Sequence, residues 1–266
     1  MRIESWMLPS WTLHYALTIL AICFFVKVAS FDKEKVVAYI LFYDLRHIQS
    51  LSMLVTEYRG ICEMGADVTL VLHTTYHEKR LLMHHLLEHT FCYRILDHLR
   101  IEISRHPQST GIYLSEVHRR RLIQDFDKYD IFIYQEDDIL LQASHIAAYL
   151  HETRKLQSLG EAIFNNFFIG FQRYRRTLLQ INGSGYKSVL PEGEFLEETP
   201  FFDPICLEGH PYHRVISNPH QGFWILTREQ LRMLENRCKF SSQSISETPD
   251  KRFVITSIHF SLHLFS

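Results

Sequence analysis

Ile131-Phe132-Ile133-Tyr134-Gln135-Glu136-Asp137-Asp138 is the stretch that decides the fold. Its first four residues are β-branched or aromatic and apolar, which is typical of a strand buried on both faces. The three carboxylates that follow repel one another, so gathering them at the end of a buried strand usually requires a cation. Because ligands bind at the carboxyl ends of strands in open α/β sheets, this stretch predicts both a parallel sheet and a binding site.

The segments before this stretch alternate between strand-like and helix-like patterns. Strands are expected over residues 36–43, 67–73 and 101–103, and helices over residues 49–64, 78–99 and 115–126. Gly65 occupies the position of a helix C-cap after the first of these helices. This alternation predicts an α/β domain with a mainly parallel sheet flanked by helices.

The segments after the stretch continue the pattern less regularly. A helix is expected over residues 143–158, a strand over residues 167–171 and another strand-like segment over residues 253–260. Residues 181–211 contain Gly, Ser and Pro and predict a long irregular loop of the kind that forms active sites. Thr227 and Gln230 form a capping-box pattern at the start of a further helix.

The N-terminus has the composition of a membrane segment. No Asp, Glu, Lys or Arg occurs over residues 5–26, about the length needed to cross a bilayer. Residues 1–30 therefore predict one N-terminal transmembrane helix that acts as a signal anchor, although Val28-Ala29-Ser30 also suits a cleavable signal peptide. With either interpretation, residues 31–266 form a domain that enters the secretory pathway. With the anchor, we expect a single-pass type II protein of the Golgi or endoplasmic reticulum membrane whose domain is lumenal.

Four cysteines outside the predicted anchor fit an oxidising compartment. Cys62, Cys92, Cys206 and Cys238 allow two disulfides in three possible connectivities, and their spacings are not those of a zinc site. Asn182 begins an Asn-Gly-Ser acceptor site for N-glycosylation. These features support a chain that enters the secretory pathway.

Charge and motif content exclude several classes of protein. The net charge is −2, with basic residues scattered along the chain, so we expect no nucleic-acid partner. There is no P-loop, no G-x-S-x-G nucleophile elbow and no H-E-x-x-H zinc motif, and the 10 glycines are too sparse for a dinucleotide-binding fingerprint.

The acidic triplet after the apolar strand resembles the D-x-D signature of glycosyltransferases with the GT-A fold. Its Glu-Asp-Asp form, Glu136-Asp137-Asp138, is similar to that of the enzymes that start complex N-glycan branches. The resemblance implies a GT-A-like fold and a Mn²⁺ or Mg²⁺ ion, for which oxygen ligands are suited. It makes Asp138 and Glu136 metal ligands and His259 a further late ligand, with His263 as the alternative.

The same resemblance implies the other parts of a transferase site. Donor-binding residues would be His118, Arg119, Glu136 and Asp137, although a solvated basic helix would also explain the first two. Acceptor-binding residues would be Asn218, Gln221, Gly222 and Trp224, although Trp224 also suits core packing. Catalytic groups would be Asp137 and, as the base of an inverting reaction, one carboxylate of the long loop: Glu194, Glu197, Glu198, Asp203 or Glu208.

The resulting hypothesis is an enzyme that transfers a sugar from a nucleotide-sugar donor to a glycan or glycoprotein acceptor. The stereochemical course stays open, because a retaining reaction needs no such base. The alternative is a catalytically inactive, transferase-like ectodomain that binds glycans or a protein partner. A metal-dependent phosphohydrolase that acts on nucleotides is a third, weaker possibility.

Overall fold

A computed structural model of the chain describes residues 31, 33–170, 177–181, 185–189, 202–207, 210–215, 222–238 and 257–259. The predicted anchor over residues 1–30 and the acceptor site at Asn182 lie outside these residues. Within them, no helix combines the length and the apolar composition that a membrane span requires. The anchor therefore stays a prediction.

A five-stranded sheet forms the centre of the fold, in the order β12-β6-β1-β2-β5. Neighbouring strands run parallel except β12, which is antiparallel to β6. The strands are β1 (Lys35–Phe42), β2 (Asp67–Thr74), β5 (Arg100–Arg105), β6 (Ile131–Glu136) and β12 (Phe223–Thr227). The prediction of a mainly parallel sheet is thus confirmed, and the acidic strand β6 pairs with the first strand.

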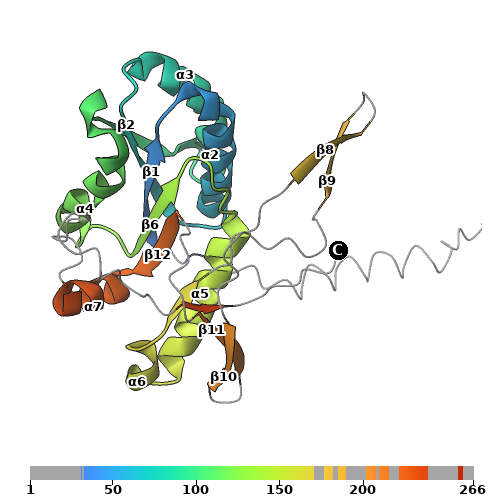
Figure 1. The fold of residues 1–266 in the computed structure, drawn as a ribbon. Helices are drawn as coiled ribbons and strands as arrows, with labels where there is room; N and C mark the ends of the chain where they lie inside the picture. Colours follow the sequence, from blue (N-terminus) through green and yellow to red (C-terminus); the bar gives the residue numbers. More distant parts are fainter. Residues whose placement is uncertain are drawn as a thin grey trace, which may run out of the picture.

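Helices cover both faces of this sheet, as predicted (Figure 1). On one face lie α2 (Ile48–Glu63), α3 (Lys79–Thr90) and α5 (Ala143–Ser158), and on the other lie α4 (Leu114–Asp125) and α7 (Arg228–Cys238). Side chains of a strand alternate between the faces, so Ala38 and Ile40 of β1 join the core under α2, whereas Val37 and Tyr39 join the core under α4 and α7. Short helical segments are η1 (Leu45–His47), η2 (Gln108–Tyr113) and α6 (Glu161–Phe164).

Local sequence signals explain two of the boundaries. The backbone N–H of Gln230 donates a hydrogen bond to Thr227 Oγ1 at 3.3 Å, and the backbone N–H of Thr227 donates one to Gln230 Oε1 at 2.9 Å. These two bonds confirm the predicted capping box at the start of α7. Gly65, just after α2, has φ +117°, and a Cβ there would lie 2.5 Å from the Phe31 carbonyl oxygen. Only glycine fits this helix end without strain.

The helix predicted over residues 78–99 is wrong in its second half. The helix α3 ends at Thr90, and a two-stranded ribbon of β3 (Phe91–Cys92) and β4 (Asp97–His98) follows. Cys92 forms a disulfide with Cys62 of α2, which ties the ribbon to the neighbouring helix. This covalent constraint competes with the helical periodicity and overrides it.

That disulfide also narrows the three predicted connectivities to one. With Cys62 and Cys92 joined, Cys206 and Cys238 are left as the possible partners of each other. Their side chains lie outside the described part of the chain. The second disulfide therefore stays a prediction.

The irregular loop predicted over residues 181–211 is also partly wrong, because segments of this region pair into strands. A second sheet has the order β10-β11-β13-β7, and β8 pairs with β9. Its strands and the hairpin are β7 (Phe168–Gly170), β8 (Thr177–Ile181), β9 (Gly185–Val189), β10 (Phe202–Leu207), β11 (His210–Val215) and β13 (Ser257–His259). Pairing between strands satisfies backbone groups that a loop would leave to water.

Candidate functional site

The order of the strands creates a topological switch point in the central sheet. From β1 the chain moves outward through β2 to β5 and then returns to place β6 on the opposite side of β1. The connections on either side of this reversal lie on opposite faces, so the carboxyl ends of β1 and β6 flank the position where ligands bind in open α/β sheets. The register places Leu41 beside Glu136, so residues 43–47 lie next to the acidic triplet.

Asp137 is buried and its carboxylate is held by the chain that leaves β1. Its side chain is only 3% exposed. Oδ2 accepts a hydrogen bond from the Tyr43 amide at 3.2 Å, and Oδ1 lies 3.1 Å from His47 Nδ1. Burial raises the pKa of Asp137, while the bonds from His47 and Tyr43 oppose that rise. The two carboxylate oxygens of Asp137 therefore link the end of β6 to the residues that follow β1.

Glu136 ends β6 and contacts Tyr134 and Gly222, the residue that precedes β12. Tyr134 Oη donates a hydrogen bond to Glu136 Oε1 at 3.3 Å. The Glu136 amide donates to the Gly222 carbonyl at 3.0 Å. Gly222 has φ +62°, and a Cβ there would come within 2.9 Å of Glu136 Oε2 and 2.5 Å of Ile139 Cδ1. The predicted acceptor residue Gly222 thus lies against the predicted metal ligand Glu136.

The third carboxylate, Asp138, is exposed to solvent. All three carboxylates are close enough to Tyr43 to affect the pKa of its hydroxyl group. The Tyr43 residue is 37% exposed. Burial raises the pKa of Tyr43 to about 12, and Glu136, Asp137 and Asp138 each contribute to the rise. The negative charge of the triplet is therefore concentrated beside Tyr43, where it would attract a cation.

Glu136 and Asp138 are the carboxylates of the triplet that could hold a metal ion. Among the described residues, no group of three or more His, Cys, Asp or Glu side chains is arranged to hold a metal. Glu136 and Asp138 nevertheless present two oxygen donors at one strand end, whereas Asp137 is occupied by protein contacts. Mg²⁺ in nucleotide sites is commonly bound by one or two carboxylates, with water and substrate phosphates completing the shell.

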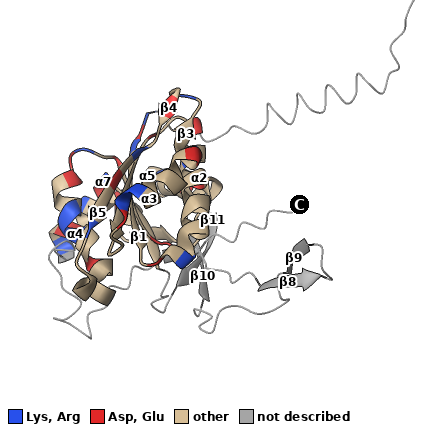
Figure 2. Cartoon of the chain, turned by 90° about the horizontal axis from the view of Figure 1, so that it is seen from above, with Lys and Arg blue, Asp and Glu red and all other residues tan. Residues whose placement is uncertain are grey.

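The predicted donor-binding residues His118 and Arg119 lie on α4, whose basic residues are blue in Figure 2. His118 is 2% exposed, and its ring stacks on Tyr134 with 4.3 Å between centroids. Burial lowers the pKa of His118 well below its usual value, and Arg119 and His73 lower it further. Arg119 is half-buried, and burial lowers its pKa while Glu116 and Tyr134 oppose this. His118 therefore contacts Tyr134, whose hydroxyl bonds Glu136, and Arg119 is close enough to Tyr134 to interact with it electrostatically.

Trp224 belongs to the same aromatic layer. It lies in β12 opposite Tyr134 of β6, with 5.9 Å between the two ring centroids. Its ring is also 5.7 Å from that of His118. The side chain is half-buried, so part of it packs in the core and part faces outward.

The remaining predicted residues belong to segments that the structure describes only in part. The backbone of Asp203 lies in β10, and that of His259 lies in β13, paired with His213 and Gly170. Their side chains lie outside the described residues, as do Asn218 and Gln221 altogether. The structure therefore does not place them relative to the triplet.

Two residues beside the triplet, His47 and Tyr43, could not be recognised from the sequence. Neither belongs to a motif. They could be found only from the topology, because residues that follow two neighbouring parallel strands lie side by side at the carboxyl ends of those strands. This requires knowing that β6 pairs with β1 and not with β5.

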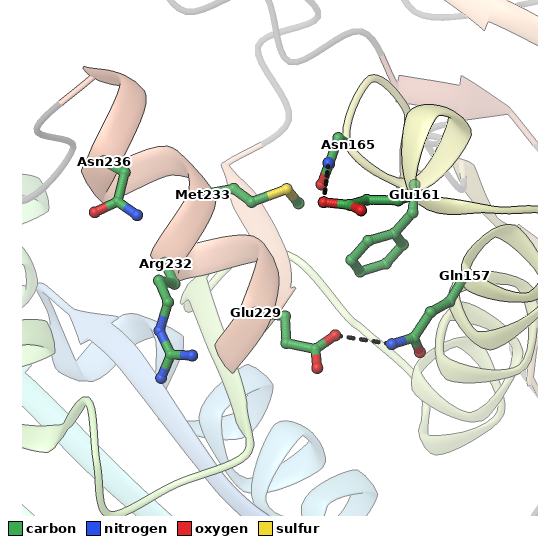
Figure 3. Close-up of a pocket in the computed structure, with 8 residues that line it drawn as sticks. Gln157, Glu161, Asn165, Glu229, Arg232, Met233 and Asn236 are labelled. Carbon is green, nitrogen blue, oxygen red and sulfur yellow. Dashed lines mark hydrogen bonds between the residues drawn. The ribbon is translucent and has the colours of Figure 1, made fainter.

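A cavity lies at the other end of β6, away from the acidic triplet. β12 runs antiparallel to β6, so α7 begins beside the amino end of β6. The cavity, of about 370 Å³, lies between α7 and the segment formed by the end of α5 and α6 (Figure 3). Gln157 Nε2 donates a hydrogen bond to Glu229 Oε2 across it at 2.9 Å. This cavity is separate from the acidic triplet.

Comparison with known proteins gives no family for this chain: no family model matches it, and no curated protein does either.

Proposed function

We propose that the chain is a metal-dependent glycosyltransferase that transfers a sugar from a nucleotide-sugar donor to a glycan or glycoprotein acceptor. The observation that carries this proposal is the position of Glu136-Asp137-Asp138 at the reversal of strand order, beside the end of β1. In this proposal Glu136 and Asp138 hold Mn²⁺ or Mg²⁺, which neutralises the departing diphosphate. The resemblance of the triplet to the D-x-D signature supports the same assignment.

The other roles follow from neighbouring residues and are part of the proposal. Arg119 would contribute positive charge near the diphosphate. Because Gly222 has no side chain, the polypeptide segment proposed to bind the acceptor can approach Glu136 closely. Trp224 offers a partly exposed aromatic face for a sugar ring. Asp203 and His259 keep their predicted roles as base and late metal ligand. The site would face the lumen of the Golgi or endoplasmic reticulum.

The test is binding of a panel of nucleotide-sugars to the full chain in detergent, with Mn²⁺ and with EDTA. We expect metal-dependent binding of one donor and a loss of at least about tenfold in affinity for Asp138→Ala, since charged contacts contribute more than neutral ones. Asp127→Asn is the matched control, because Asp127 is exposed and precedes the amino end of β6. Metal-independent binding, or no effect of Asp138→Ala, would refute the proposal.

The second candidate is a transferase-like ectodomain that binds glycans or a protein partner without turnover. The observation that favours it is the lack of a preformed three-residue metal group in the described part of the chain. It predicts that wild-type protein binds a glycan with equal affinity in Mn²⁺ and in EDTA and forms no product. Product formation that requires both donor and metal would exclude it.

A further inference from the structure

His47 is held beside the acidic triplet by a short capped turn. η1 begins after Asp44, whose Oδ1 accepts a hydrogen bond from the Arg46 amide at 2.9 Å. The His47 amide donates to the Asp44 carbonyl at 3.0 Å, and α2 begins at the next residue. The position of His47 is therefore fixed by the end of β1 and the start of α2.

The contact with Asp137 determines what the imidazole presents to solvent. Oδ1 of Asp137 lies 3.1 Å from Nδ1, while the other carboxylate oxygen accepts the Tyr43 amide. Because the Asp137 carboxylate accepts the Tyr43 amide through one oxygen, we assign it as the acceptor of the His47 contact as well, which puts the proton on Nδ1. In the neutral ring Nε2 then has a free lone pair, and the His47 side chain is 42% exposed.

We propose that His47 is a substrate-binding residue, whose Nε2 accepts a hydrogen bond from a hydroxyl group on the sugar of the donor, and that Asp137 is its positioning residue. This inference rests on the proposed function. Asp137 stands between Glu136 and Asp138 in the chain, and His47 Nδ1 lies 3.1 Å from its Oδ1, so His47 is a neighbour of the triplet that the proposed function assigns to the metal. The sugar of a nucleoside-diphosphate donor is attached to the second phosphate, so in the proposed site it would lie near the groups that surround the triplet, and His47 is a partly exposed one among them.

The arrangement gives Asp137 a role different from the one that the sequence suggested. A carboxylate that is 3% exposed and bonded through both oxygens has little surface for substrate. It instead selects one tautomer of an exposed imidazole, as carboxylates do for histidines in many active sites. His47 would then distinguish a donor sugar that has a hydroxyl group at this position from one that lacks it.

The test compares a nucleotide-sugar with the nucleoside diphosphate that lacks the sugar, both bound to the full chain with Mn²⁺. The wild type should bind the nucleotide-sugar more tightly. His47→Phe keeps an aromatic ring but has no acceptor, so it should lose about three- to tenfold in affinity for the nucleotide-sugar and nothing for the nucleoside diphosphate. His85→Phe is the control, because His85 is an exposed histidine on α3.

The other outcomes each overturn the inference in a recognisable way. An equal loss for both ligands would place His47 at the nucleotide or the diphosphate, and no loss would remove it from the site. An unchanged donor affinity with a raised KM for the acceptor would assign it to the acceptor. If the wild type binds no nucleotide-sugar, the proposed function fails as well.

Nitrogen-15 NMR of the imidazole provides a readout that is independent of binding. Wild-type His47 should show the proton on Nδ1 at neutral pH, and Asp137→Asn should weaken that preference because the amide is a poorer acceptor for this bond. A proton on Nε2 in the wild type would overturn the role of Asp137 even if donor binding were observed.

Discussion

Acidification should destabilise this protein through histidines that the fold buries in their neutral form. His73 of β2 is 3% exposed, and its Nδ1 lies 3.1 Å from His106 Nε2. Burial, followed by His106 and Arg121, lowers the pKa of His73 to about 4 from its usual 6.5. Burial also lowers the pKa values of His106 and His118. We therefore expect all three to favour the unfolded state as the pH falls.

The sign and size follow from proton linkage. Between pH 6.5 and 4 the unfolded chain binds a proton at residue 73 that the folded chain does not, so stability falls as the pH falls. With a pKa of about 4 in the folded state and 6.5 in the unfolded state, His73 alone contributes a loss of about 2 kcal/mol between pH 7.5 and pH 5.0. His118 adds to this loss, whereas the raised pKa of Asp137 acts in the opposite direction.

Urea unfolding followed by far-ultraviolet circular dichroism at the two pH values measures this loss. His73→Leu should reduce the pH dependence by about 2 kcal/mol, whatever its effect on stability at pH 7.5. His85→Leu removes an exposed histidine and should leave the pH dependence unchanged. If His73→Leu and the wild type lose equal stability, the buried neutral state of His73 is not the cause and the reasoning is refuted.

Three further predictions concern the framework of the site. Replacing Cys62 and Cys92 together with Ala should lower the free energy of unfolding by about 3.5 kcal/mol, from a sequence separation of 30; a change below 1 kcal/mol in urea unfolding would contradict this. Gly222→Ala should cost at least about 1 kcal/mol because of its φ of +62°, and unchanged thermal stability would argue against that backbone. Tyr58→Phe should cost about 1–3 kcal/mol, because Tyr58 Oη donates to the buried Gln135 Oε1 at 2.7 Å; a neutral effect would show that the amide finds another partner.

Much of the central sheet could be predicted from the sequence because its signals are local. The expected helix over residues 143–158 has the same bounds as α5, and the capping pattern of Thr227 and Gln230 marks the start of α7. Apolar runs gave the strands β1, β2 and β6 because strands buried on both faces need little else. These elements depend on periodicity and capping, which a single segment carries by itself.

The failures arose where distant residues decide the local structure. The helix over residues 78–99 looked continuous because nothing in it announces the bond between Cys92 and Cys62. The partnership of His47 with Asp137 joins residues 90 positions apart, and no spacing within the chain encodes it. It depends on which strand lies beside β1, and several strand orders are compatible with the same alternation of strands and helices.

His118 is the residue for which packing and function make opposite predictions. It was expected to bind the donor, yet its ring stacks on Tyr134, and within the described residues no side chain forms a hydrogen bond with either ring nitrogen. His118→Phe would keep the stacking and remove the buried polar atoms, so we expect stability at pH 7.5 to stay equal or rise by up to about 1 kcal/mol. The destabilisation by acid should become smaller, since one buried neutral histidine is removed. Donor binding measured on the same variant separates the two roles, because a packing residue would leave the affinity unchanged, whereas a loss of about tenfold or more in a stable variant would show that the imidazole contacts the donor.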